Sequence, residues 1–319
     1  MIWFWLGYFG LVALLLFLDL GVIHRKAQEQ SLRSAAMWTV GWIALGLSFS
    51  GIVFLMYEHR WLDIKGPAGG EAAITYVSAY LLEQALSVDN IFVISMVFRS
   101  FKVPIKYQHR VLFWGILGAI GFRIIMLGGG VWLARRFDWI FYVFGAYLAW
   151  QGFQLVRGKE EEPDIENSWG VRQVRKVVRV VNGEEHGNTF SVIINGRRAL
   201  TTVALCLITI EFTDIVFALD SIPAVLSVSS ETFIIVTSNI FAIMGLRSLY
   251  FVLAGAMKKF QYLELALGVL LIGIGIKMIG HAGGIFHISH LVSLIAIAGI
   301  IASGIIASML FGKPEAEQS

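Results

Sequence analysis

The chain has 319 residues, of which 57% are hydrophobic and 15% are charged, with a formal net charge of +3. Soluble domains carry about 25% charged residues, so this composition excludes an ordinary soluble protein. Apolar runs recur along the whole sequence, each long enough to cross a hydrocarbon layer of about 30 Å as a helix. The basic residues stand mostly between these runs and indicate no nucleic-acid partner. We predict an all-α polytopic protein embedded in a lipid bilayer.

The apolar runs predict nine transmembrane helices. They cover residues 3–23, 36–57, 72–98, 109–133, 138–156, 200–227, 232–256, 261–280 and 290–311. The first run lacks a basic leading segment and a small-residue cleavage site, so we expect a retained helix rather than a signal peptide. The predicted membrane domain is 1–312, followed by a cytoplasmic tail over 313–319.

Basic residues predict the orientation, because short cytoplasmic loops are enriched in Lys and Arg. They follow the first, third and seventh predicted spans as Arg25, Lys26, Arg33, Arg99, Lys102, Lys106, Arg110, Lys258 and Lys259. These loops share one side of the membrane. The loop with Arg135 and Arg136 is the exception on the other side. We predict a bacterial plasma (inner) membrane protein with its N-terminus outside and its C-terminus in the cytoplasm.

Residues 157–199 interrupt the apolar pattern. After an acidic start, apolar and polar residues alternate around two Asn-Gly pairs, at 182–183 and 195–196. This pattern is typical of β-hairpins and predicts a small cytoplasmic hairpin element. Four basic residues lie in this segment: Arg172, Arg175, Lys176 and Arg179. They fit either a contact with the anionic inner leaflet or a solvated linker face.

Two parts of the sequence resemble each other. When Asp89 is set against Asp220, an acid lies six residues before each, and a small polar residue, Asn90 or Ser221, follows each. Arg123 then aligns with Arg247. The repeats cover about 72–156 and 200–280, and three crossings each make the second copy inverted. Inverted repeats are typical of secondary transporters, which bind substrate where the copies meet.

Five acids lie within two predicted spans: Glu83, Asp89, Glu211, Asp214 and Asp220. Asp19 lies near the end of the first span. An ionised group at a helix centre costs about 2.5–3.5 kcal/mol, so something must neutralise these acids. Three kinds of neutralisation are possible: protonation of the acids, ion pairs with basic residues, or a bound cation. Candidate partners for ion pairs are Arg123, Arg247 and Lys277.

The side chains around these acids favour a hard cation if a cation binds. Ser87, Asn90 and Ser221 add oxygen atoms to the carboxylates, a set that suits Mg²⁺, Mn²⁺ or Ca²⁺. Asp220 lies six residues after Asp214, about 240° around a helix, so a straight helix points the two acids apart. Pro223 predicts a kink that frees a backbone carbonyl nearby.

Several motifs resemble the TerC family of integral membrane proteins. They are "LDLGVIHRK" (18–26), "EQALSVDNIFV" (83–93), "EFTDIVFALDSIPAV" (211–225) and "SNIFAIMGLRSLYF" (238–251). The resemblance covers the membrane region in collinear order. It implies manganese efflux, with Mn²⁺ as the substrate. It also implies that the five acids, with Asn90 and Ser221, handle the metal.

Other functions fit parts of the pattern. Asp89 and Asp220 could form the dyad of an intramembrane protease, but the sequence lacks the Gly-x-Gly-Asp signature and three acids would stay unexplained. A membrane scaffold with statically bound metal is a second alternative, and it predicts no net flux. A redox subunit lacks paired histidines and clustered cysteines, since Cys206 is the single cysteine. The sequence therefore favours a transporter and no enzyme activity.

Overall fold

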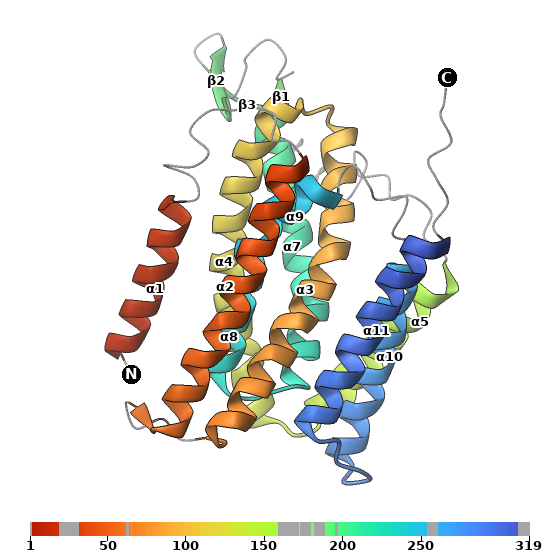
Figure 1. Ribbon diagram of the computed structural model, residues 1–319. Coiled ribbons are helices and arrows are strands. Elements are labelled where there is room, and N and C mark those ends of the chain that lie inside the picture. The colour runs from red at the N-terminus through yellow and green to blue at the C-terminus, as the bar shows by residue number, and fades with distance from the viewer. Residues whose placement is uncertain are drawn as a thin grey trace.

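The computed structural model describes residues 2–18, 32–61, 64, 66–158, 172, 180–181, 189–194, 197–253 and 261–311. These residues form a helical bundle with a small sheet at one end (Figure 1). The helices are α1 (Ile2–Phe17), α2 (Leu32–Glu58), α3 (Gly69–Ser100), α4 (Ile105–Arg136), α5 (Ile140–Arg157), α7 (Thr202–Leu226), α8 (Thr232–Met244), α9 (Leu246–Leu253), α10 (Gln261–Ala282) and α11 (His290–Phe311). The all-α class predicted from composition is confirmed.

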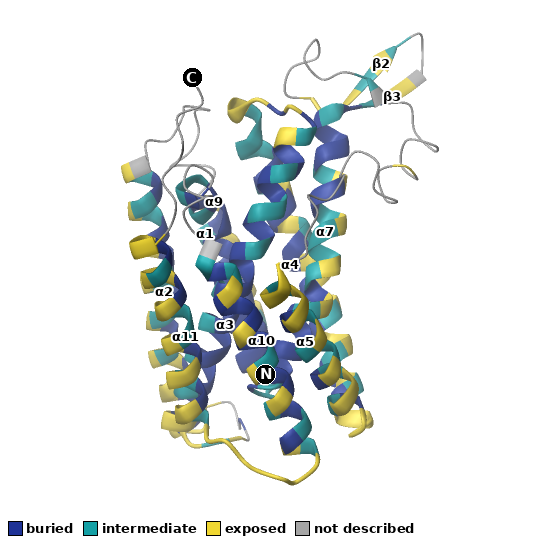
Figure 2. Cartoon of the chain, turned by 90° about the vertical axis from the view of Figure 1, so that its right-hand side faces the viewer, coloured by how far each residue is buried: buried dark blue, intermediate teal, exposed yellow. Residues whose placement is uncertain are grey.

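Helix α3 forms the interior of the bundle. It contacts α2, α7, α8 and α11, and 67% of its most apolar stretch is buried, against 17% for α11. Apolar side chains on the outside of the bundle are exposed instead, among them Ile125, Trp132 and Ile295 (Figure 2). A core helix surrounded by helices with apolar outer faces is the arrangement expected in a bilayer, where lipid covers those faces.

The predicted count of nine membrane spans is not confirmed. Within the described residues, six helices are long and apolar enough to cross a membrane, or seven if the bent pair α8–α9 is one span. The described part of α1 has 16 residues and α5 has 18. These lengths give about 24 and 27 Å, short of the hydrocarbon thickness of about 30 Å. Polar residues such as Gln151 and Arg157 also lower the apolarity of α5.

The kink predicted at Pro223 does not interrupt its helix. Helix α7 continues through Pro223 to Leu226, because the proline lies in its last turn. The bend lies between α8 and α9, which meet at 44° around Gly245. A Cβ atom on Gly245 would lie 3.3 Å from Cβ of Trp42, so glycine allows α2 to approach the bend closely. The interruption seen in the described residues therefore lies in the predicted seventh span.

Helices α5 and α10 cross in backbone contact at four glycines. A Cβ atom on Gly145 would lie 2.8 Å from the carbonyl oxygen of Gly275, and one on Gly268 would lie 2.8 Å from that of Gly152. If the alignment of Arg123 with Arg247 is continued with a gap of one residue, it pairs Gly145 with Gly268 and Gly152 with Gly275, and the two contacts are then equivalent. The crossing is thus reciprocal, since each contact has a counterpart with the helices exchanged.

The sheet contains β1 (Val180–Val181), β2 (Ser191–Ile194) and β3 (Arg197–Thr201), in the order β1-β3-β2. Strands β2 and β3 pair antiparallel with Ile194 opposite Arg197, which leaves a two-residue connection at the second Asn-Gly pair. Strand β1 pairs with β3 in parallel. The first Asn-Gly pair and Arg175, Lys176 and Arg179 lie outside the described residues, while Arg172 is exposed.

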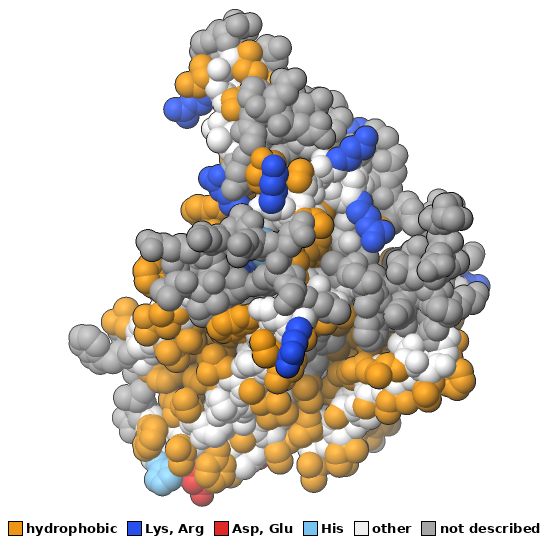
Figure 3. Space-filling view, turned by 45° about the horizontal axis from the view of Figure 1, so that its top comes forward, with side chains coloured by type: hydrophobic (Ala, Val, Ile, Leu, Met, Phe, Trp, Pro, Cys, Tyr) orange, Lys and Arg blue, Asp and Glu red, His pale blue; other side chains and the backbone are white. Residues whose placement is uncertain are grey.

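Basic side chains gather at the end of the bundle that carries the sheet (Figure 3). Those on described residues are Arg33, Arg99, Lys102, Lys106, Arg110, Arg157, Arg172 and Arg198. The opposite end has Arg60, Arg135 and Arg136 together with Glu58, Glu71, Asp138 and Glu231. Because the sheet end has the excess of Lys and Arg, the positive-inside rule continues to predict that it is cytoplasmic.

Candidate functional site

Arg123 of α4 occupies the centre of the bundle. It is 1% exposed and forms an ion pair with Glu83 of α3, which is equally buried. On its other side it forms a forked contact with Asp214 of α7, with Nη2 3.2 Å from Oδ1 and Nε 3.5 Å from Oδ2. Nη1 also donates to Oγ of Ser221 at 3.3 Å. One guanidinium therefore connects α3, α4 and α7 in a geometry that suits two carboxylates.

Small residues on α4 allow α7 to come this close. The side chain of Glu211 lies directly over Gly118, where any Cβ atom would overlap its carboxylate. Gly115, one turn earlier, faces Ile210. Glu211 is half-buried, and its Oε2 atom has no hydrogen-bond partner among the described residues. Glu211 and Asp214 therefore share the face of α7 that packs on α4, as their spacing of three residues predicts.

Asp220 belongs to a different cluster. Its Oδ1 atom accepts a hydrogen bond of 2.6 Å from the hydroxyl of Tyr147 and one of 3.1 Å from Nε2 of Gln151, both on α5. Gln151 also donates to the Tyr147 hydroxyl at 3.2 Å. Asp220 thus faces α5, away from Arg123, as expected for six residues on a straight helix. Neither Tyr147 nor Gln151 was predicted from the sequence, although two polar residues four apart in an apolar helix were a usable signal.

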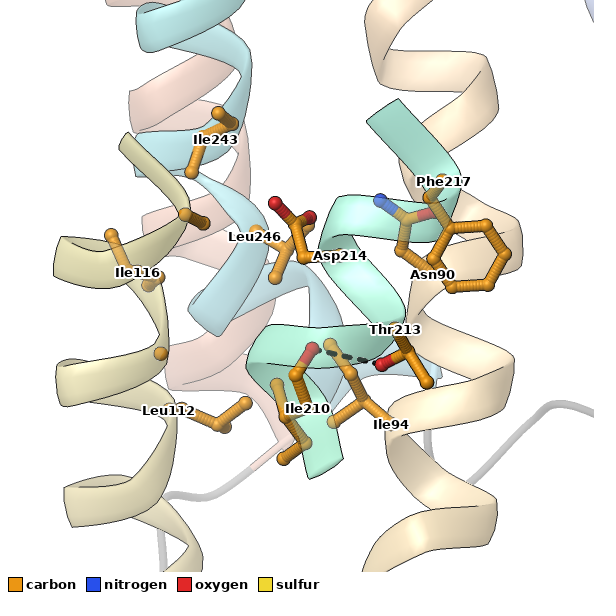
Figure 4. A pocket seen from close by; sticks show the side chains of 12 residues that line it. Asn90, Ile94, Leu112, Ile116, Ile210, Thr213, Asp214, Phe217, Ile243 and Leu246 are labelled. Carbon is orange, nitrogen blue, oxygen red and sulfur yellow. Dashed lines mark hydrogen bonds between the residues drawn. The ribbon is translucent and has the colours of Figure 1, made fainter. Parts of the chain in front are cut away.

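A small pocket lies beside Asp214 (Figure 4). Asn90, Thr213 and Asp214 supply its polar wall, and apolar side chains such as Ile94, Ile116 and Ile243 supply the rest. Its walls come from α3, α4, α7 and the α8–α9 bend. The cavity measures about 20 Å³, and about 10–15 Å³ is enough for one water-sized occupant. Asn90 and Asp214, selected from sequence, therefore both line one small, mostly apolar cavity.

The remaining predicted residues lie at different places. Asp89 is half-buried on α3, and Ser87 is fully buried one turn after Glu83. Arg247 is 3% exposed and follows the α8–α9 bend. Lys277 lines a separate cavity with Glu71, Glu231 and His281 at the end opposite the sheet. Asp19 lies outside the described residues.

The acids predicted to handle metal lie in separate surroundings in this structure, and their role in metal binding stays a prediction. Among the described side chains, no three His, Cys, Asp or Glu residues are grouped closely enough to hold a metal ion. Two physical reasons account for this. Arg123 takes up Glu83 and Asp214, and the helical twist of α7 carries Asp220 to α5. For Glu83 and Asp214, the ion-pair solution that the sequence left open is the one observed.

The fold and the site define a class: a polytopic helical membrane protein with a buried charge network between its central helices. The chain belongs to the integral membrane protein TerC family, whose model matches residues 68–316. It is 40% identical over 309 residues to "Uncharacterized membrane protein STKORF319" of Myxococcus xanthus, covering 96% of this chain and 92% of that protein. It is also 40% identical over 299 residues to "Putative membrane-bound redox modulator Alx" of Escherichia coli (strain K12), covering 93% and 91%. No solved structure matches the chain.

Proposed function

We propose that this TerC-family protein is a secondary transporter of divalent metal cations, with Mn²⁺ efflux as its activity, and that it is not an enzyme. One observation carries the proposal. Glu83 and Asp214, acids from the two similar motifs, meet in the membrane interior on a single internal cation, Arg123. Two carboxylates carry two negative charges and share only one positive charge here. A divalent cation could therefore replace Arg123 as their counter-charge.

Arg123 solves an electrostatic problem for such a transporter. Buried carboxylates are costly without a counter-charge, and removing one partner of a buried pair is strongly destabilising. The guanidinium supplies that charge while no cation is bound. An incoming divalent cation offers Asp214 a stronger attraction and competes with Arg123 for the same oxygen atoms. We infer that this competition couples cation entry to a shift of α4 relative to α7.

The pocket beside Asp214 supports a hard cation as the substrate. It joins the Asp214 carboxylate to the Asn90 amide and the Thr213 hydroxyl, and its volume admits one ion or water at a time. Carboxylate, amide and hydroxyl oxygen atoms are ligands that Mn²⁺ and Mg²⁺ accept. The choice of Mn²⁺ rests on the family resemblance. Asp220 is a second acidic position along α7, held by uncharged donors.

The proposed transporter has nine crossings and two inverted repeats. The reciprocal glycine contacts of α5 and α10 support the repeat, since a two-fold axis between the copies requires them. Helix packing agrees, because α4 contacts α7 as α8 contacts α3. Alternating access would follow from rocking of one copy against the other. The Lys and Arg residues at the sheet end support a cytoplasmic sheet and an N-terminus outside, in the inner membrane of a bacterium.

The name of the Alx relatives suggests a second function, redox modulation. A thiol mechanism would depend on Cys206, which is fully buried. A protease dyad would need Asp220 beside another carboxyl group, whereas its Oδ1 atom is held by Tyr147 and Gln151. A static scaffold is the alternative that shares the charge network, and it differs from a transporter in its flux.

The test is Mn²⁺ flux through purified protein in sealed liposomes that enclose a Mn²⁺-quenched fluorophore. Wild type should quench the dye well above protein-free liposomes, and Asp214→Asn and Asp220→Asn should each reduce the rate at least tenfold. Asp138→Asn, an exposed acid between α4 and α5, is the matched control and should retain the rate. A wild-type rate equal to that of empty liposomes would overturn the transport proposal and favour the scaffold.

A further inference from the structure

Asn239 of α8 is an unexplained buried polar residue. Its exposure is 0%, and neither its amide oxygen nor its amide nitrogen has a hydrogen-bond partner among the described residues. Its neighbours on α8 are satisfied, because Thr237 donates to the carbonyl of Phe233 and Ser238 to that of Ile235. A buried amide without partners costs free energy, so such a residue calls for an explanation.

Asn239 faces the centre of the bundle. The opposite side of α8 is marked by Phe241, whose ring contacts Tyr8 of α1 and Phe49 of α2. Asn239 lies two residues earlier, about 200° around the helix, and so points towards α3 and α4. Ile243, one turn further along α8, lines the pocket beside Asp214 (Figure 4). Asn239 therefore extends the pocket-lining face of α8 by one turn.

Another unsatisfied oxygen atom lies near this level on α3. The Gln84 amide donates to the carbonyl of Ala242 at 3.4 Å, which fixes the register of α3 against α8. Glu83, adjacent to Gln84, has its Oε2 atom buried without a partner. Because Asn239 lies three residues before Ala242, Asn239 and Glu83 lie within about one helical turn of each other along the bundle.

We propose that Asn239 is a ligand of the transported cation, in a second position next to the pocket. This inference rests on the proposed transport function. The amide oxygen of Asn239 and Oε2 of Glu83 would supply two oxygen ligands to a partly hydrated divalent cation. One bound cation explains both unsatisfied groups, whereas two explanations would be needed if each were only structural.

The neutral amide has a role that a carboxylate would not fulfil. Glu83 already gives this position one negative charge, and a second would hold a divalent cation more strongly and slow its release. An amide oxygen completes the coordination without adding charge. Asn239 is thus expected to set the balance between binding and release at this position, and changing its charge should alter Mn²⁺ affinity in a predictable direction.

The experiment measures the Mn²⁺ dependence of the melting temperature of the purified full chain in detergent. Asn239→Leu keeps the side-chain size and removes both polar atoms. We expect its metal-free melting temperature to equal or exceed that of wild type, and its half-maximal Mn²⁺ concentration to rise at least tenfold. Ser238→Ala is the matched control, because Ser238 is equally buried but its hydroxyl is satisfied within α8. Its Mn²⁺ dependence should equal that of wild type.

Asn239→Asp provides the opposite change and serves also if the leucine variant does not fold. Its half-maximal Mn²⁺ concentration should fall at least threefold, while flux slows. If wild type responds to Mn²⁺ and the tested variants respond at the same concentration, Asn239 is not a ligand and the proposed function stands. If wild type itself shows no Mn²⁺ response, the proposed function fails, and this inference fails with it.

Discussion

Asp214 and Asp220 lie six residues apart on α7 but have opposite kinds of partner. Asp214 forms an ion pair with Arg123 in the bundle core, while Asp220 accepts hydrogen bonds from the uncharged Tyr147 and Gln151. Losing Arg123 leaves a charge stranded in the core, whereas losing Tyr147 removes one hydrogen bond from an uncharged donor and leaves the one from Gln151. One helix thus carries an acid whose counter-charge must be replaced if it is lost, and another whose individual partners can be lost at small cost.

The largest effect is expected from Arg123→Met, which removes the charge and keeps an apolar stem of similar length. Glu83 and Asp214 are then buried without their shared partner, so we expect a loss of about 3–5 kcal/mol in the free energy of unfolding. Denaturant unfolding in detergent measures it. Arg135→Met, at the exposed end of the same helix, should cost less than about 1 kcal/mol. A loss equally small for Arg123→Met would contradict the core ion pair.

An intermediate effect is expected from Gly275→Ala, which displaces the helix that carries the hydrogen-bond donors to Asp220. The added methyl group would overlap the carbonyl of Gly145 and displace α5, which carries Tyr147 and Gln151, from α10. Overpacking of this kind costs about 1–3 kcal/mol. A methyl group on Gly273 of the same helix would meet no neighbouring atom within 4 Å, and Gly273→Ala should be neutral or stabilising by up to about 1 kcal/mol. Equal melting temperatures for the two variants would rule out a close crossing.

The smallest effect is expected from Tyr147→Phe, which deletes one neutral donor to Asp220. The net loss should be about 0.5–1.5 kcal/mol, because Gln151 still donates to the same oxygen. A double-mutant cycle with Asp220→Asn isolates the contact. Tyr142→Phe, on an exposed part of α5, is the control and should change little. If the cycle gives no coupling energy, Asp220 does not depend on Tyr147 and the contrast with Asp214 loses its basis.

The sequence predicted the class, the family and the acidic motifs, because burial of charge in an apolar run is visible without a structure. The separation of Asp214 from Asp220 was also predictable, since it depends only on helical twist. The meeting of Glu83 and Asp214 at Arg123 was not, because it depends on whether the Arg123 side chain of α4 reaches both α3 and α7. The bend between α8 and α9 was not predicted either. Pro223 lies in the last turn of α7 and does not interrupt it, whereas the chain bends around Gly245, where Trp42 packs closely.

The junction between the sheet and α7 would allow movement of α7 to be measured from the sheet. Thr201 ends β3 and caps α7, and its buried hydroxyl accepts a hydrogen bond from the amide of Ala204 while donating to the carbonyl of Thr189. Thr202 adds a bond to the carbonyl of Val181. Because no flexible joint separates the strands from the acidic helix, the two should turn as one body. A fluorophore at Ile193, which is 72% exposed on β2, would then report rotation of α7 from the aqueous side without any label in the bilayer.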